Sequence, residues 1–312
     1  MCEPDDFDAF AHRAGELSRR QFGALALGAG LAAALPPLLP AGVAVAQTAG
    51  VLAAGVTMQG AEVEIRTPDG LADAYFVHPA SGKHPGVLIW PDIFGLRPAF
   101  KQMATRLAGS GYAVLVVNPF YRTKRAPTAP EHPDFNDPPT RQALMALAGT
   151  LNAATAVTDA KAFVAYLDAQ NAVDTKSKAG TTGYCMGGPF VLRTAAAMPE
   201  RIGAAATFHG GGLVTDKPDS PHLLIGQSRA QYLIAIAAND DEREPDAKRV
   251  LRETFDSAHR PAEVEVYPGT MHGWCPPDAV VYNHDQAERA WARLLELFER
   301  ALGPRGARAL GS

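Results

Sequence analysis

The fold is decided by the stretch Ala179-Gly180-Thr181-Thr182-Gly183-Tyr184-Cys185-Met186-Gly187-Gly188-Pro189-Phe190. Small and β-branched residues lead up to Gly183, and an apolar helical pattern follows Gly187. Cys185 therefore occupies the nucleophile position of a Gly-x-nucleophile-x-Gly elbow, a sharp turn from a strand into a helix. Small neighbours are needed because a Cβ on such strained backbone would collide with the adjacent strand and helix. The alternative is a chance pattern around an inert, buried cysteine.

The helix predicted after this turn favours chemistry at Cys185. Its free N–H groups and the positive end of its dipole point at the sulfur, which favours a thiolate and any oxyanion formed there. We therefore expect the N–H of Met186, the residue after the nucleophile, to donate to that oxyanion. A second donor is expected in the loop after Trp90.

Outward from this turn, strands alternate with helices along most of the chain. Period-two patterns at 62–66 and 72–77 flank the turn Pro68-Asp69-Gly70 and predict an antiparallel hairpin. Further strands are predicted at 86–90, 112–117, 203–208, 231–237 and 263–267. This order predicts one α/β domain over residues 61–302, with a mostly parallel central sheet, helices on both faces and the hairpin at its start. We expect residues 47–60 to form a loose lead-in and residues 303–312 a tail.

A nucleophilic cysteine requires a general base and an acid that orients the base. His272 follows the last predicted strand, where a loop can bring the imidazole back over the elbow. Asp240 ends the preceding strand, and Asp241 is the alternative acid because one residue of register decides between them. The order Cys185, Asp240, His272 is the nucleophile, acid, histidine order of α/β-hydrolases.

The segment His209-Gly210-Gly211-Gly212 is similar to the oxyanion motif of lipases, but it follows the nucleophile strand, whereas that motif precedes it. We interpret it as a flexible loop that lines the pocket. Tyr121 and Trp274 are candidate pocket residues because they lie near strand ends, with simple packing as the alternative.

From about residue 60 to 302 the chain resembles the dienelactone hydrolase family. The resemblance is carried by Gly183-Tyr184-Cys185-Met186-Gly187-Gly188, Asp240, His272-Gly273, Pro91-Asp92-Ile93-Phe94-Gly95 and Asn118-Pro119-Phe120-Tyr121-Arg122. It implies that Ile93 supplies the second oxyanion N–H and that the Asp92 carboxylate pairs with the resting thiol. It also implies that Arg122 binds a substrate carboxylate.

Two positions depart from the family pattern. Asp92 stands where the family usually has glutamate, and Pro276 stands where a second arginine is expected. Losing one of two charge-assisted contacts weakens the selection of a carboxylate-bearing substrate. The expected activity is hydrolysis of a lactone or small activated ester without cofactor or metal. The alternatives are a broad esterase, a thiol peptidase, or a non-catalytic binding protein with this fold.

Residues 1–46 resemble a twin-arginine signal peptide. The pair Arg19-Arg20 precedes an apolar run at 23–39, and Ala44-Val45-Ala46 provides a cleavage site. We expect the twin-arginine export machinery to carry the folded chain to the periplasm or beyond. An uncleaved anchor helix is the alternative.

Composition narrows the partners of the remaining chain. A net charge of -4 argues against nucleic acid. No later apolar run approaches the roughly 18 residues that a stable membrane span needs. Only Cys185 and Cys275 follow the signal, too few for a disulfide framework, and a bond between them would consume the proposed nucleophile.

Overall fold

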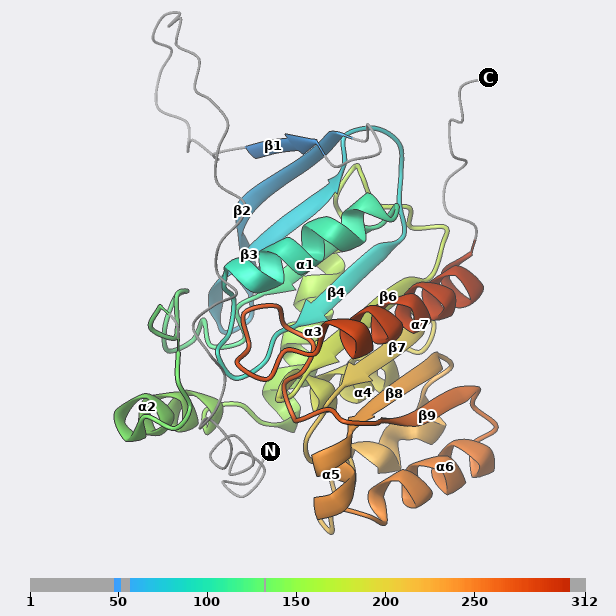
Figure 1. Cartoon of the computed structure of the whole chain (residues 1–312). Coiled ribbons are helices and arrows are strands. Elements are labelled where there is room, and N and C mark those ends of the chain that lie inside the picture. The colour runs from blue at the N-terminus through green and yellow to red at the C-terminus, as the bar shows by residue number, and fades with distance from the viewer. Residues whose placement is uncertain (1–47, 52–56, 132, 304–312) are drawn as a thin grey trace, which may run out of the picture.

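The structure is a computed structural model that describes residues 48–51, 57–131 and 133–303 (Figure 1). The predicted signal peptide and all but the first residue of the predicted tail lie outside the described residues. Within the described part of the chain, no helix combines the length and apolar character needed to cross a membrane.

One sheet organises the described chain, and its nine strands lie in the order β1-β2-β3-β5-β4-β6-β7-β8-β9. The strands are β1 Thr48–Val51, β2 Thr57–Thr67, β3 Gly70–Pro79, β4 Gly86–Trp90, β5 Ala113–Val117, β6 Ala179–Tyr184, β7 Ile202–Phe208, β8 Gln231–Ala237 and β9 Ala262–Tyr267. The first three strands pair antiparallel, as does β3 with β5, and all pairs from β5 to β9 are parallel. This confirms the mostly parallel sheet with an opening hairpin. The expectation of a loose lead-in is wrong for 48–51 and 57–60, which pair as strands.

The helices are α1 Pro98–Gly109, α2 Pro138–Ala148, α3 Ala153–Asp168, α4 Gly187–Ala197, the 3₁₀ helix η2 Pro221–Gln227, α5 Ala238–Arg243, α6 Ala247–Ser257 and α7 His284–Leu302. Local chemistry sets several of their starts. Pro98 occupies the first turn of α1, where a missing N–H costs nothing. The Asn152 side chain accepts from the N–H groups of Ala154 and Thr155 and so begins α3.

Side chains of the parallel strands alternate between two apolar cores, one on each face of the sheet. In β4, Val87 and Ile89 pack in the core that includes α1 and α7. Leu88 and Trp90 pack in the other core, which includes α3, α4 and α6. Every residue of β4 is buried, which explains its continuous apolar sequence. Figure 1 shows α1 and α7 together on one side of the sheet.

The parallel pairing brings the carboxyl ends of β4, β6, β7, β8 and β9 to one edge of the sheet. The segments that follow these ends carry Asp92, Cys185, His209, Asp240 and His272. Residues far apart in the chain therefore meet at a single edge, which is where open α/β sheets place their sites.

Candidate active site

The elbow is the turn between β6 and α4. Cys185 has φ 52, in the left-handed region that non-glycine residues avoid. A Cβ on Gly183 would lie 2.4 Å from the Gly187 carbonyl oxygen, and one on Gly187 would lie 2.4 Å from the Trp90 carbonyl oxygen. Only glycine allows this approach of strand, turn and helix, and the turn holds the Cys185 backbone in its strained conformation.

His272 lies five residues after β9 and contacts the first turn of α5. Its Nδ1 is 2.8 Å from Asp240 Oδ2, and its backbone N–H donates to Asn239 Oδ1 at 2.7 Å. Thr270 fastens the same loop, because its hydroxyl accepts from the Ala238 N–H at 3.2 Å and donates to the Tyr267 carbonyl at 2.7 Å. These contacts hold the backbone of the loop, and the Asp240 contact directs Nδ1 of the ring towards the carboxylate.

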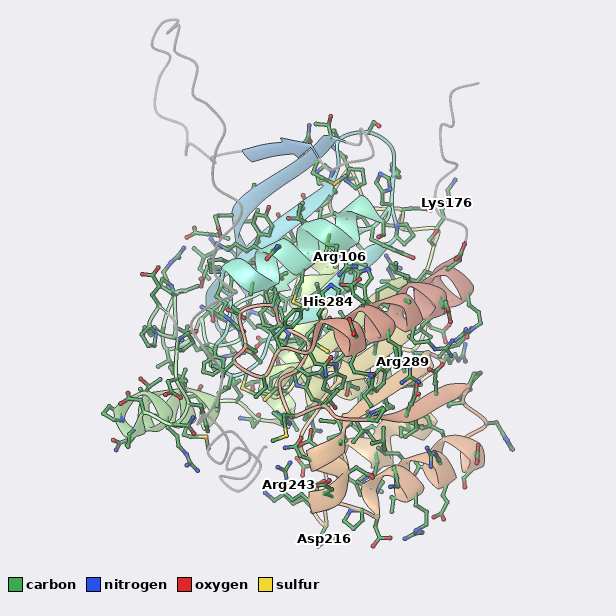
Figure 2. The ribbon with its side chains drawn as sticks, in the orientation of Figure 1. Arg106, Lys176, Asp216, Arg243, His284 and Arg289 are labelled. Atoms are coloured by element: carbon green, nitrogen blue, oxygen red, sulfur yellow. The ribbon has the colours of Figure 1, made fainter. Side chains whose placement is uncertain are left out.

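The structure also distinguishes the two neighbouring carboxylates. Asp240 contacts His272, whereas Asp241 Oδ2 accepts from Lys248 Nζ at 2.6 Å. The other oxygen of Asp240 accepts from Arg243 Nη2 at 3.0 Å, and Figure 2 shows Arg243 at the α5 edge. Neither α5 nor this arginine was predicted from the sequence. The Asp-x-x-Arg spacing, which places the two side chains on one helix face, is the signal that would have found the arginine.

The electrostatics favour a protonated imidazole. Burial by itself lowers the pKa of His272, but the charges of Asp240 and Cys185 and their hydrogen bonds to the ring outweigh burial. The pKa of His272 therefore lies well above its ordinary value. Cys185 and His272 are each 2% exposed. Cys185 and Cys275 are free thiols.

Asp92 does not have the surroundings that the resemblance implies. Its two carboxylate oxygens accept from Arg97 Nη1 at 2.6 Å and Nη2 at 2.9 Å. Arg97 also donates to Asp278 through Nε at 2.7 Å. Both oxygens of Asp92 thus contact a buried arginine that the resemblance does not include, and the pairing of Asp92 with the thiol stays a prediction. Arg97 was not predicted from the sequence, because its partner Asp278 is too far along the chain for spacing to reveal the pair.

Arg122 and Tyr121 belong to a structural network. Arg122 donates to both oxygens of Asp159, at 2.7 and 2.8 Å, and to Asp69 at 3.0 Å. Its guanidinium lies 4.6 Å from the Tyr121 ring centroid, and the Tyr121 hydroxyl donates to Asp159 at 2.8 Å and bonds to Thr67. The polar groups of both residues are thus engaged within the protein, and their substrate-binding role stays a prediction.

Trp274 packs beneath the His272 loop. Its side chain is fully buried, stacks on Tyr267 with ring centroids 5.3 Å apart, and meets His209 at 5.1 Å. Trp274 is therefore a packing residue, which is the alternative stated above. The expectation that Trp274 lines the pocket is wrong, because its side chain is fully buried.

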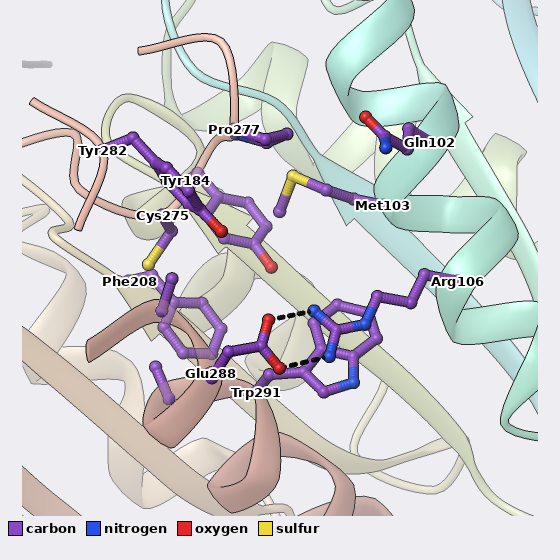
Figure 3. Close-up of a pocket in the computed structure, with 12 residues that line it drawn as sticks. Gln102, Met103, Arg106, Tyr184, Phe208, Cys275, Pro277, Tyr282, Glu288 and Trp291 are labelled. Atoms are coloured by element: carbon purple, nitrogen blue, oxygen red, sulfur yellow. Dashed lines mark hydrogen bonds and ion pairs between the residues drawn. The ribbon is translucent and has the colours of Figure 1, made fainter. Parts of the chain in front are cut away.

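Two cavities lie near the carboxyl edge of the sheet. One, of about 130 Å³, lies between α1 and α7, where Figure 3 shows Arg106 paired with Glu288 beside Tyr184 and Cys275. The other, of about 30 Å³, is lined by Asp240, Gly210 and Gly211. Gly210 and Gly211 thus border this cavity together with Asp240.

The chain is similar to known hydrolases over most of this domain. The sequence profile of the dienelactone hydrolase family matches residues 72–302. A carboxymethylenebutenolidase of Rhodococcus opacus is 28% identical over 243 residues, which cover 76% of this chain and 90% of that protein.

Solved structures resemble the fold. A dienelactone hydrolase-like promiscuous phosphotriesterase from metagenomic libraries matches with a TM-score of 0.65 and 24% identity. The match covers 79% of this chain and 99% of the phosphotriesterase chain. The dienelactone hydrolase of Anabaena variabilis has a TM-score of 0.55 and 17% identity, with coverage of 79% and 99%. The chain therefore belongs to the dienelactone hydrolase family and is a hydrolase with an α/β fold.

Proposed function

We propose that the protein hydrolyses a lactone or a small activated carboxylic ester, with Cys185 as nucleophile, His272 as proton carrier and Asp240 as the acid that orients His272. One observation carries the proposal: the 2.8 Å contact between His272 Nδ1 and Asp240 Oδ2, at the sheet edge that also holds the Cys185 elbow. A relative named carboxymethylenebutenolidase supports a lactone as the substrate class.

Acylation begins when the Cys185 sulfur attacks the carbonyl carbon while His272 holds the thiol proton. The tetrahedral oxyanion collapses, the ring or ester C–O bond breaks, and His272 returns its proton to the leaving oxygen. Water then attacks the thioester, with His272 taking one of its protons, and the carbon–sulfur bond breaks. The products are a carboxylic acid, an alcohol or enol, and the original thiol.

Backbone N–H groups supply the oxyanion contacts. Met186 precedes the first turn of α4, and Ile93 lies in the loop after β4, so both amides belong to the catalytic edge. Within the described chain, neither amide N–H donates to a protein acceptor. Backbone N–H groups without a hydrogen-bond partner at a helix N-terminus are suited to stabilise a developing oxyanion.

A cysteine nucleophile favours esters and lactones with good leaving groups. Thiolate attacks a carbonyl readily, but an amine is a poorer leaving group than an enolate in the resulting intermediate. This distinguishes the proposal from a thiol peptidase on the same fold.

The test compares turnover of lactones, aryl esters and anilides by the wild type, Cys185→Ala and Cys275→Ala. We expect Cys185→Ala to lose about 10³-fold or more in kcat on lactones and esters. Cys275→Ala is the matched control, because it also removes a buried thiol. Wild-type turnover by Cys185→Ala would refute the mechanism, and anilide rates equal to ester rates would favour a peptidase.

A further inference from the structure

His209 combines two features that lower the stability of the fold. It follows β7 directly and has φ 42, in the left-handed region. A histidine in this conformation costs free energy that glycine would avoid, yet three glycines follow it immediately. The chain therefore keeps this strained histidine, although glycine at the same position would relieve the strain.

The ring of His209 is also poorly satisfied. The residue is 1% exposed, and neither ring nitrogen has a hydrogen-bond partner on another residue in the described chain. Buried polar atoms without partners cost free energy, and an apolar ring of similar size would avoid that cost. A purely structural role would favour phenylalanine here.

The contacts of His209 point to the catalytic imidazole. Its ring centroid lies 5.1 Å from that of His272, with the planes inclined by 65°. On its other sides it meets Trp274 at 5.1 Å and Tyr184 at 6.0 Å. Its backbone N–H donates to the Ala235 carbonyl at 2.8 Å, which fixes the residue to β8. His209 is thus a fixed wedge between His272 and the aromatic side chains beneath it.

The charges around the pair favour one proton on His272 and none on His209. The ionisable residues next to the two rings are Tyr184 from β6, whose ring meets His209, and Cys185 from the elbow and Asp240 from α5, which interact with His272. Burial, followed by the charge of His272, holds the pKa of His209 well below its ordinary value. A neutral imidazole next to a protonated one offers an electron-rich face and ring dipole without charge repulsion.

We propose that His209 is a positioning residue that holds the His272 imidazole in the orientation reaching both Asp240 and Cys185, and that it stabilises the protonated form of this ring. The proposal rests on the proposed function of His272 as proton carrier. On this proposal, the strained backbone and the unpaired ring nitrogens of His209 are retained because they serve catalysis.

The experiment uses His209→Phe, which keeps an aromatic wedge but removes both nitrogens, and His209→Gly, which removes the wedge and the strain. The control is His259→Gly, which relieves a similar φ of 52 at an exposed position. The measurements are the kcat/KM profile against pH, the NMR titration of His272, and the urea midpoint of unfolding.

For His209→Phe we expect kcat/KM to fall about tenfold. The alkaline limb of the kcat/KM profile and the NMR titration of His272 should both move to lower pH. The urea midpoint of unfolding should be unchanged or higher. His209→Gly should shift the titration in the same direction, which provides the answer if the phenylalanine variant does not fold. The control should keep the wild-type profile.

An unshifted His272 titration in a folded variant would overturn the proposal, as would an activity loss that only follows a loss of stability. The titration does not depend on turnover. Failure of the Cys185→Ala test would therefore refute the proposed function separately from the role of His209.

Discussion

Arg97 binds Asp92 through two parallel hydrogen bonds of 2.6 and 2.9 Å, with side chains only 9% and 8% exposed. The same guanidinium reaches Asp278, 181 residues away, in the segment that follows His272. One arginine therefore ties the loop after β4, which contains Ile93, to the segment after β9. Breaking this tie should affect both stability and the oxyanion contact.

Arg97→Ala should lower the free energy of unfolding by about 3–5 kcal/mol, because it leaves two carboxylates without their partner, one of them buried. Arg97→Lys should recover little of this loss, since an ammonium cannot reproduce paired bidentate geometry. Urea unfolding at neutral pH measures both. The control is Arg125→Ala, which removes a pair with Glu64 whose side chains are 58% and 50% exposed and should cost less than about 1 kcal/mol. Equal effects of the two alanine variants would contradict this reading.

Asp240→Asn should reduce kcat by about 10³–10⁴-fold, because the amide no longer stabilises the protonated ring or selects its tautomer. Asp241→Asn is the matched control, since that carboxylate pairs with Lys248 and should leave kcat near the wild-type value. Steady-state rates on an aryl ester distinguish the two. A larger loss from Asp241→Asn would reassign the acid.

Arg122→Ala should destabilise the protein without changing its preference for carboxylate-bearing substrates. Asp159 is buried, with a side chain 2% exposed, and would lose its bidentate partner, at a cost of about 3 kcal/mol. The ratio of kcat/KM for paired substrates with and without a carboxylate should stay constant. Arg122→Met combined with Asp159→Leu should recover stability, because it removes the unpaired charge. A fall in this kcat/KM ratio in Arg122→Ala would show instead that Arg122 binds the substrate carboxylate.

Stability should respond to pH in opposite senses at the two neighbouring histidines. The pKa of His272 in the folded state is raised above 6.5. The stability that His272 contributes is therefore complete below pH 6.5 and is lost as pH rises through the folded-state pKa. The folded-state pKa of His209 is lowered, so its contribution is present above pH 6.5 and is lost as pH falls towards the folded value. Urea unfolding across pH should show His272→Gln flattening the alkaline side and His209→Phe flattening the acid side. Unchanged slopes in both variants would contradict the opposed shifts.

We propose that the chain is exported in folded form, on the basis of Arg19-Arg20 and the apolar run that follows. Replacing both arginines by lysine should retain the full-length chain in the cytoplasm, because the twin-arginine route reads this pair. Cell fractionation and N-terminal sequencing provide the measurement, with Gln47 expected as the first residue of the exported form. Export of the double variant would show that another route operates.

Much of the fold and the outline of the site could be predicted from the sequence, because they depend on neighbouring residues. Apolar runs predicted β4 and β8 with the observed bounds, since a strand buried on both faces needs apolar side chains throughout. The strands at 48–51 and 57–60 were not predicted, because these short segments contain few of the β-branched and aromatic residues that indicate a strand. The short helix α5 was also overlooked, because six residues are too few for a helical period.

By itself, the sequence determined the elbow at Cys185, the alternation of strands and helices, and the order of Cys185, Asp240 and His272 along the chain. These depend on local sterics and on the spacing of elements along the chain. Only the tertiary structure decided that Asp92 faces Arg97, that Arg122 serves Asp159, and that His209 lies against His272. Such contacts join side chains from segments distant in sequence, and packing geometry, which no local pattern encodes, selects each partner.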